Sequence, residues 1–144
     1  MFLGTYSPKL DDKGRLIVPA KFRDAFADGL VMTKSQEHAL AVYPQADFLN
    51  KMSNLASAPN TLRQVRSYQR MVMAAASDDR LDSQGRVTIP PHLRAYAGLE
   101  RDVVVIGAGD RAEIWDAETW NRYAEEQESD FSDMDGEFTA FTGT

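Results

Sequence analysis

One short pattern occurs twice in this chain, once in each half. Residues 10–19 read LDDKGRLIVP and residues 81–90 read LDSQGRVTIP, so both copies contain Leu-Asp-x-x-Gly-Arg, an apolar run and a proline. A unit this small cannot bury its apolar face alone, and two copies in one chain usually pack on each other. The sequence therefore predicts two similar halves that share a core. It also places the turn arginine twice, which favours recognition of a repetitive partner.

Each copy predicts a turn, a strand and a short helix in that order. Aspartate bonds nearby backbone amides and glycine tolerates a positive φ, so Asp-x-x-Gly is turn chemistry. The branched residues that follow favour a strand. Pro19 and Pro90 fit the first position of a helix, where no amide donor is needed, and Gly29 and Gly98 fit the helix ends. Further strands are expected over 30–32, 40–43, 103–106 and 112–115, an edge strand within 1–7, and helices from 44 and from 116.

The composition suits a globular protein, with 43% hydrophobic residues in a chain of 144. That length corresponds to one ordinary domain or to two half-domains with a shared core. The sequence has no cysteine, which excludes disulfides and thiolate zinc sites. It has no apolar run long enough for a transmembrane helix and no secretory leader, so we expect a cytoplasmic protein with no membrane partner.

The net charge of −6 is concentrated near the C-terminus. Residues 116–144 contain nine acidic residues and one basic residue, out of totals of 22 and 16. Residues 1–115 therefore hold thirteen acidic and fifteen basic residues, a net charge of +2. A body close to neutral can present a basic face to a phosphate backbone. The charge pattern is thus compatible with DNA binding without requiring it.

A helix is expected between the two copies, over 60–76, with Asn60 as its N-cap. Arg63, Arg66 and Arg70 have the spacing of one helix face. These arginines can contact phosphates, remain solvated, or pair with acidic residues of a neighbouring subunit.

The doubled turn, with strand, proline and helix placed alike in both copies, resembles the MraZ family of bacterial transcription regulators, which belong to the AbrB-like class of swapped-hairpin barrels. The signature of that family is a pair of Asp-x-x-x-Arg motifs, which stand here at residues 11–15 and 82–86. Residues 1–4 and 115–120 are also similar to the family. The resemblance covers roughly residues 1–124.

The resemblance implies an α+β fold in which a tandem intramolecular repeat forms an AbrB-like swapped-hairpin β-barrel with short helices and a helical connector. We divide the chain accordingly into a first half-barrel repeat (1–50), the connector (51–77), a second half-barrel repeat (78–124) and an acidic, flexible tail (125–144). The resemblance further implies a nucleoid-associated homo-oligomeric ring of about eight or more subunits. Such a ring would bind GTG-rich tandem direct repeats in double-stranded DNA and repress the division and cell-wall gene cluster.

Arg15 is the candidate for reading bases, because arginine paired with guanine O6 and N7 is the commonest specific contact to a base. Gly14 and Lys13 are assigned to the same DNA contact, and the lysine suits a phosphate or a second guanine. Arg86 is the equivalent residue of the second copy, where base contact and structural pairing with Asp82 are both open. The second turn lacks the lysine, so we expect the first turn to dominate the contact with DNA.

Asp11, Asp82 and Gly85 are expected to support the two turns. Asp11 can bridge to Arg15 merely to hold the turn, or it can hold Arg15 in the orientation that DNA requires, and both interpretations are open. An arginine four residues after an aspartate keeps that carboxylate ionised, which is poor for shared-proton catalysis. We therefore do not expect an enzyme.

The remaining residues with possible chemistry do not suggest a cofactor. His38 and His92 stand in unmatched contexts, and Trp115 and Trp120 fit a core or an interface better than a stacking platform. We expect no metal and no cofactor. The alternative function is an oligomeric protein-interaction module, or an antitoxin-type module, whose acidic tail docks a partner.

Overall fold

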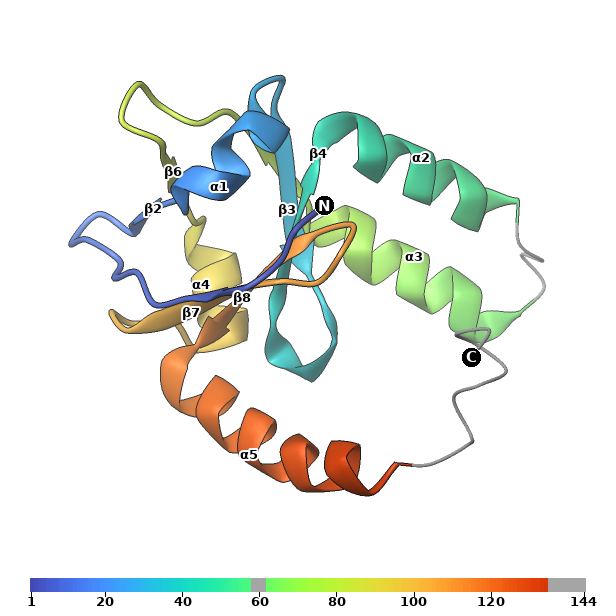
Figure 1. The fold of residues 1–144 in the computed structure, drawn as a ribbon. Helices are drawn as coiled ribbons and strands as arrows, with labels where there is room; N and C mark the ends of the chain where they lie inside the picture. Colours follow the sequence, from blue (N-terminus) through green and yellow to red (C-terminus); the bar gives the residue numbers. More distant parts are fainter. Residues whose placement is uncertain (58–61, 135–144) are drawn as a thin grey trace.

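The computed structural model describes residues 1–57 and 62–134. The first half contains β1 (Thr5–Tyr6), β2 (Arg15–Ile17), α1 (Ala20–Arg23), β3 (Leu30–Lys34), β4 (Leu40–Pro44) and α2 (Gln45–Ala56). The connector α3 (Arg63–Ala75) leads to β5 (Ser77–Asp79), β6 (Arg86–Thr88), α4 (Pro91–Ala97), β7 (Val103–Gly107), β8 (Ala112–Asp116) and α5 (Ala117–Asp133). The predicted internal repeat is confirmed, since β2-α1-β3-β4-α2 corresponds to β6-α4-β7-β8-α5 (Figure 1).

The strands of the described residues form two antiparallel sheets. The larger sheet has the order β1-β7-β8-β4-β3-β5, and the smaller one is the two-stranded ribbon of β2 and β6. The two halves join at the centre of the larger sheet, where Leu40 lies opposite Ile114, and again in the ribbon, because β2 and β6 come from different halves. The predicted α+β class is confirmed. The hydrogen-bonded strands do not close into a barrel, since β1 and β5 lie at the two ends of the larger sheet.

The main core lies between one face of the larger sheet and the layer formed by the ribbon, α1 and α4. Leu16 from the ribbon and Leu93 from α4 are almost completely buried in it. The ring of Phe2 closes this core near the N-terminus, with centroids 5.1 Å from Phe22 and 5.2 Å from Phe26. Equivalent elements of the two halves thus bury their apolar residues against each other, as a duplicated unit requires.

A second, smaller core lies on the opposite face of β3 and β4, the face that α2 and α3 cover (Figure 1). Phe48 and Met52 of α2 and Val72 of α3 pack there on the outward-facing residues of the two strands. The hydroxyl of Thr33 donates a hydrogen bond of 2.6 Å to the Val72 carbonyl and ties β3 to α3. Burial on both faces explains why residues 30–32 of β3 and 40–43 of β4 are apolar without alternation.

The last helix extends away from the sheet. Asp116 caps it by accepting a hydrogen bond from the Thr119 amide at 3.0 Å. The rings of Trp120 and Tyr123 lie 5.1 and 4.9 Å from the buried Trp115, which anchors the first turns of α5 to β8. The side chains that follow, from residue 125 to residue 134, are exposed.

The observed helix starts differ from the predicted ones by one position. Pro19 and Pro90 precede α1 and α4 and do not occupy their first positions. Their ψ angles of 135° and 147° are not helical, while their carbonyls accept hydrogen bonds from the amides of Phe22 and Leu93. Both prolines therefore act as N-cap residues. The prediction for Gly98 is confirmed, because it ends α4 with a φ of 63°.

Helices occupy part of the predicted connector and part of the segment assigned to the tail. The helix expected over 60–76 is α3, and the expected N-cap Asn60 lies outside the described residues. Within the segment assigned to a flexible tail, α5 continues to Asp133, and residues 135–144 are not described. Every helix in the described ranges is too short or too polar to cross a lipid bilayer.

We expect Leu16→Ala to destabilise the protein by about 2–5 kcal/mol, because it leaves a cavity at a position that is 1% exposed. The neighbouring substitution Ile17→Ala is a matched control, since Ile17 is 53% exposed and its loss is expected to cost about 0.5 kcal/mol. Urea unfolding at one fixed protein concentration measures both variants. Equal losses would contradict the inner and outer faces assigned to the ribbon.

Candidate nucleic-acid interface

One carboxylate holds the first Asp-x-x-Gly-Arg turn together. Asp11 accepts hydrogen bonds at Oδ1 from the backbone amides of Lys13 and Arg15, both at 2.9 Å. Its Oδ2 accepts a hydrogen bond from Arg15 Nε at 2.6 Å. The amide of Gly14 closes the turn by donating to the Asp11 carbonyl at 3.0 Å. The same carboxylate thus fixes the turn and the direction of the Arg15 side chain.

The second turn repeats this geometry. Asp82 accepts hydrogen bonds from the amides of Gln84 and Arg86 at 2.9 and 2.8 Å, and from Arg86 Nε at 2.8 Å. The Gly85 amide donates to the Asp82 carbonyl at 3.0 Å. The two turns therefore make equivalent hydrogen bonds, although the residues between aspartate and glycine differ.

Each turn is also bonded to the other half of the chain. The carbonyl of Gly14 accepts a hydrogen bond from the Ile89 amide, and the carbonyl of Gly85 accepts one from the Val18 amide, both at 2.9 Å. Both glycines have a φ of 75°, a conformation that residues with a Cβ rarely adopt. These reciprocal bonds extend the β2–β6 ladder and bring the two predicted sites together.

The ribbon has one polar and one apolar face. Arg15 lies opposite Thr88, and Ile17 lies opposite Arg86. Because side chains alternate along a strand, these four residues point to one side, and the residues between them point into the core. Ile17 and Thr88 are members of this surface that the motif alone did not identify. The alternation of residue types along each strand is the sequence signal that points to them.

Each of the two ribbon arginines is held through Nε alone. Within the described residues, the terminal amino groups of Arg15 and Arg86 make no hydrogen bond. The two side chains are 30% and 25% exposed. Their terminal amino groups are therefore available to a planar pair of acceptors, such as a phosphate or a guanine edge. Pairing with the aspartate and contact with a base are compatible in this geometry.

The two carboxylates are ionised at neutral pH. The backbone amide and the guanidinium of Arg15 lower the pKa of Asp11 below its ordinary value of 3.8, and those of Arg86 likewise lower the pKa of Asp82. Because the folded-state pKa is lowered, these hydrogen bonds contribute stability above pH 3.8 and lose it as the pH falls through that lowered pKa. Neither carboxyl group carries a proton that it could donate near pH 7.

Two further arginines brace the turns, each from the opposite half. Arg94 of α4 donates from Nη1 to the Lys13 carbonyl at 3.4 Å. A Cβ atom at Gly14 would meet the guanidinium of Arg94, and a Cβ atom at Gly85 would meet that of Arg23 from α1. The turn motif alone does not identify Arg23 and Arg94. Their matched positions after the two prolines are the signal that points to them.

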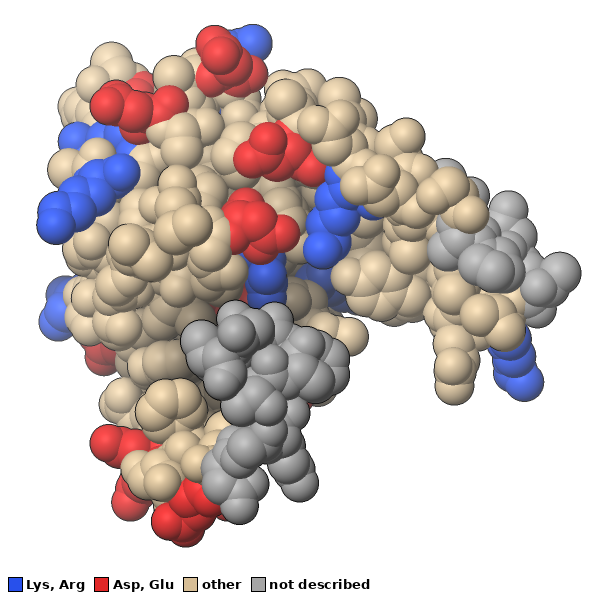
Figure 2. Space-filling view, turned by 45° about the vertical axis from the view of Figure 1, so that its right-hand side comes forward, with Lys and Arg blue, Asp and Glu red and all other residues tan. Residues whose placement is uncertain are grey.

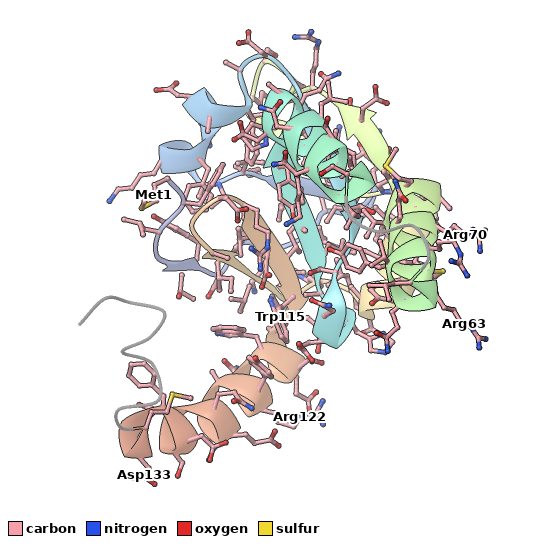
Figure 3. The ribbon with its side chains drawn as sticks, turned by 90° about the vertical axis from the view of Figure 1, so that its right-hand side faces the viewer. Met1, Arg63, Arg70, Trp115, Arg122 and Asp133 are labelled. Carbon is pink, nitrogen blue, oxygen red and sulfur yellow. The ribbon has the colours of Figure 1, made fainter. Side chains whose placement is uncertain are left out.

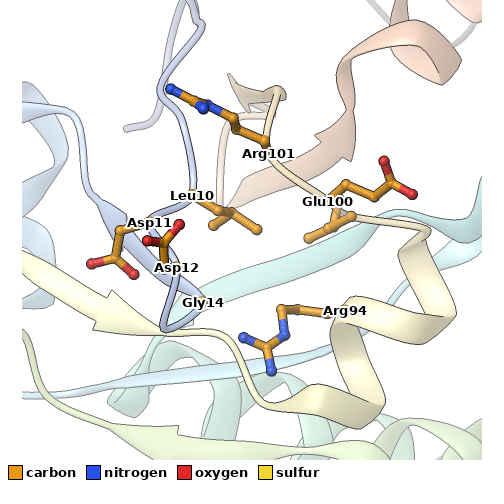
Figure 4. Close-up of a pocket in the computed structure, with 8 residues that line it drawn as sticks. Leu10, Asp11, Asp12, Gly14, Arg94, Glu100 and Arg101 are labelled. Atoms are coloured by element: carbon orange, nitrogen blue, oxygen red, sulfur yellow. The ribbon is translucent and has the colours of Figure 1, made fainter.

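A polar cavity of about 600 Å³ lies beside the first turn (Figure 4). Arg94 points into it toward the turn, as Figure 4 shows. The charged residues that line it are Asp11, Asp12, Glu100, Arg94 and Arg101. This mixture of signs gives the cavity no clear preference for an anion or a cation. In the part of the chain that the structure describes, no group of acidic or histidine side chains is arranged to hold a metal ion.

The arginine stripe of the connector lies apart from the turns. Arg63, Arg66 and Arg70 belong to α3, which packs on the face of the larger sheet opposite the ribbon (Figure 1). The structure therefore brings together the predicted residues of the two turns but does not bring the stripe to the same surface.

Comparisons with known proteins agree with the duplicated architecture. The chain matches the family described as "MraZ protein, putative antitoxin-like" twice, over residues 1–71 and 72–141. The transcriptional regulator MraZ of Paenarthrobacter aurescens (strain TC1) is 56% identical over 135 residues, 94% of each chain. That of Leifsonia xyli subsp. xyli (strain CTCB07) is 54% identical over 137 residues, 95% of this chain and 96% of the relative. That of Thermobifida fusca (strain YX) is 56% identical over 134 residues, 93% of this chain and 94% of the relative.

We expect Gly14→Ala to destabilise the protein more than Gly98→Ala. Both substitutions place a side chain at a positive φ, which costs about 1–2 kcal/mol. Only at Gly14 does the new Cβ meet the Arg94 guanidinium, whereas nothing lies within 4 Å of a Cβ at Gly98. The flexible Arg94 side chain must then move and lose its hydrogen bond to the Lys13 carbonyl, so the expected difference is small. Urea titrations of both variants, and of Gly14→Ala combined with Arg94→Ala, measure the difference and the coupling. Equal losses at the two glycines, with additive effects of Arg94→Ala, would contradict the packing of Arg94 on the turn.

Proposed function

This chain belongs to the MraZ family, and from that premise we propose that it is a sequence-specific DNA-binding transcriptional regulator. The relatives in P. aurescens and L. xyli are named transcriptional regulators and are similar over nearly their whole length, which supports this role. The proposed operator consists of GTG-rich tandem direct repeats, and the proposed role is repression of the division and cell-wall gene cluster. The resemblance of the doubled turn motif supports these finer points.

The outward face of the ribbon carries the proposal. Arg15 and Arg86 stand on one surface, and their terminal amino groups are available. A two-stranded β-ribbon fits the major groove of B-DNA, which is about 12 Å wide, and arginine is the commonest reader of guanine there. A single chain therefore offers two guanine-reading side chains to one groove.

The spacing of the two arginines suits a GTG sequence. Arg15 lies opposite Thr88, two residues from Arg86, and such diagonal neighbours in an antiparallel ladder lie about 7–8 Å apart. The two guanines of GTG are separated by two base steps of about 3.4 Å each, a similar length. One ribbon can thus direct one arginine to each guanine. Ile17 or Thr88, between them, can contact the methyl group of the intervening thymine.

Lys13 distinguishes the two turns. It is exposed in the first turn, where the second turn has the neutral Gln84. An additional lysine can contact a phosphate, and each such contact releases counterions and strengthens binding at low salt. This supports the first turn as the stronger DNA contact.

Assembly into a ring would make a small reading surface sufficient. One turn reads only a few base pairs, whereas specific DNA binding typically has a Kd of about 10⁻⁸ M or below. In a ring of about eight or more subunits, contacts after the first one become intramolecular. Such a ring favours direct repeats about one helical turn apart, so that all boxes face the protein. The pairing of β2 with β6 across the two halves supports the AbrB-like, swapped-hairpin class for each subunit.

A protein-docking module of the antitoxin type is the second candidate. The description of the matching family as antitoxin-like favours it. The end of α5 is acidic and exposed, and Phe131 on it is 72% exposed. In this alternative the ribbon still binds DNA, while α5 holds a partner protein.

We expect Arg15→Ala to weaken binding to a GTG-repeat DNA fragment at least about 10-fold, because each guanine contact contributes about 1–3 kcal/mol of discrimination and several turns bind at once. Arg86→Ala is expected to act in the same direction. Gel shifts with fragments in which either guanine is replaced by 7-deazaguanine, which lacks N7, identify the base that each arginine reads. The DNA affinity of Arg15→Ala should not change when the guanine that Arg15 reads is replaced. The affinity of Arg86→Ala should likewise not change when the other guanine is replaced.

Arg122→Ala is the matched control, since it removes the same side chain from α5, away from the ribbon. Its affinity is expected to stay within about twofold of wild type. Unchanged affinity and unchanged base preference in Arg15→Ala would remove the central residue from the proposal.

A further inference from the structure

The outer face of α3 is basic, and two of its three arginines, Arg63 and Arg70, form no ion pair within the described residues. The helix contains no acidic residue. Arg63 and Arg70 are exposed. Both point away from the sheet in Figure 3. Arg66 is half-buried between them on the same face. This face is therefore a candidate for contact with a negatively charged partner.

The free end of α5 has the opposite character. Its acidic residues are all exposed: Glu125, Glu126, Glu128, Asp130 and Asp133. Figure 2 shows acidic side chains along the lower edge of the molecule, where α5 projects. The helix contacts the body through its first turns, which pack on Trp115. The acidic end therefore extends beyond the surface that anchors the helix.

The two charged faces do not meet within one chain. In Figure 3, Arg63 and Arg70 lie at one side of the molecule and Asp133 lies at the other. Complementary faces on different sides of a subunit produce a heterologous, head-to-tail contact, which generates a ring if the rotation closes. A second copy of the chain is thus the partner that both faces fit.

The spacing of the charges also matches. Along α3 in reverse order, Arg70, Arg66 and Arg63 follow one another at intervals of four and three residues. Along α5, Glu126, Asp130 and Asp133 follow at the same intervals in forward order. With a common rise of about 1.5 Å per residue, an antiparallel alignment places each arginine beside one carboxylate. A parallel alignment has no such match in α5.

Exposed apolar side chains border both charged faces. Met71 borders the arginine face of α3 and is 53% exposed; Met134 and Phe131, at the end of α5, are 47% and 72% exposed. When the two right-handed helices lie antiparallel, Met71 of α3 falls on the same side of the contact as Phe131 and Met134 of α5. A hollow of about 240 Å³, lined by Tyr68, Met71 and Tyr96, lies next to that side of α3. The contact would therefore bury apolar surface as well as pair charges. Exposed ion pairs alone contribute too little free energy to hold two chains together.

We propose that a second copy of this chain lays the acidic face of its α5 antiparallel across the arginine face of α3. The inference rests on the ring proposed above and identifies its subunit contact. Arg63, Arg66 and Arg70 are then interface residues, and the acidic end of α5 is covered by the neighbouring subunit. The turns of the ribbon remain outside this contact.

Charge reversal tests this contact. We expect Arg63→Glu/Arg70→Glu alone, and Glu126→Lys/Asp133→Lys alone, to elute at the protomer mass of 16.1 kDa in size-exclusion chromatography with light scattering. An equimolar mixture of the two variants should assemble again, with the variants in alternation, because each presents the face that the other needs. The variant with all four substitutions should also assemble. Arg63→Gln/Arg70→Gln, with unchanged circular dichroism, should dissociate at lower salt than wild type.

Either reversed variant assembling alone as wild type does, or a mixture that stays at the protomer mass, would overturn the proposal. Arg63→Glu/Arg70→Glu with unchanged mass but weakened DNA binding would assign the stripe to phosphates and overturn it as well. Arg15→Ala separates this result from the proposed function, since it should assemble normally and fail only in the gel shift. A wild-type protein of 16.1 kDa would overturn both the contact and the ring, and the test of DNA reading by Arg15 would be unaffected.

Discussion

The short ladder between β2 and β6 is the constraint on which the rest of the structure depends. Each strand has three residues, and an isolated ribbon of that size is not stable in water. Each turn glycine has its carbonyl satisfied by an amide of the other half. The ribbon therefore forms only when both halves fold together, which makes the duplication a requirement of the fold. The same ladder that buries Leu16 turns Arg15 and Arg86 to the outside.

The aspartates act on the arginines more through orientation than through stability. Both ion pairs are partly exposed, and such pairs contribute little to the free energy of unfolding. Asp11, however, binds two backbone amides and Arg15 Nε at once, so it couples the side chain to the shape of the turn. An arginine already held in one direction loses less conformational entropy when it binds a planar ligand. In the proposed function, this restriction is what makes a solvent-exposed guanidinium a selective reader of bases.

In the proposed function, the separation of acidic and basic residues lets a chain of net negative charge present a DNA-binding surface. The excess of carboxylates belongs to α5 and the residues after it, whereas the ribbon and its bracing arginines belong to the near-neutral body. In the proposed subunit contact the acidic end of α5 faces the arginines of a neighbour, which neutralises both faces. In these two proposals the basic ribbon and the acidic end of α5 serve different contacts and do not compete at one surface.

The two turns, most of the strands and the pairing of Asp11 with Arg15 were predictable from the sequence, because each depends on residues at most a few positions apart. The repeat was predictable because both copies carry the same pattern. Helix boundaries were less certain, as Pro19 and Pro90 show, since an N-cap and a first helical position differ by one residue. The strand order, the shared face of Arg15 and Arg86, and the bracing of each turn by an arginine of the other half are visible in the folded chain alone. The physical reason is that register and packing join residues far apart in the chain, and a shift of one residue in the ladder would turn every side chain of a strand to the opposite face.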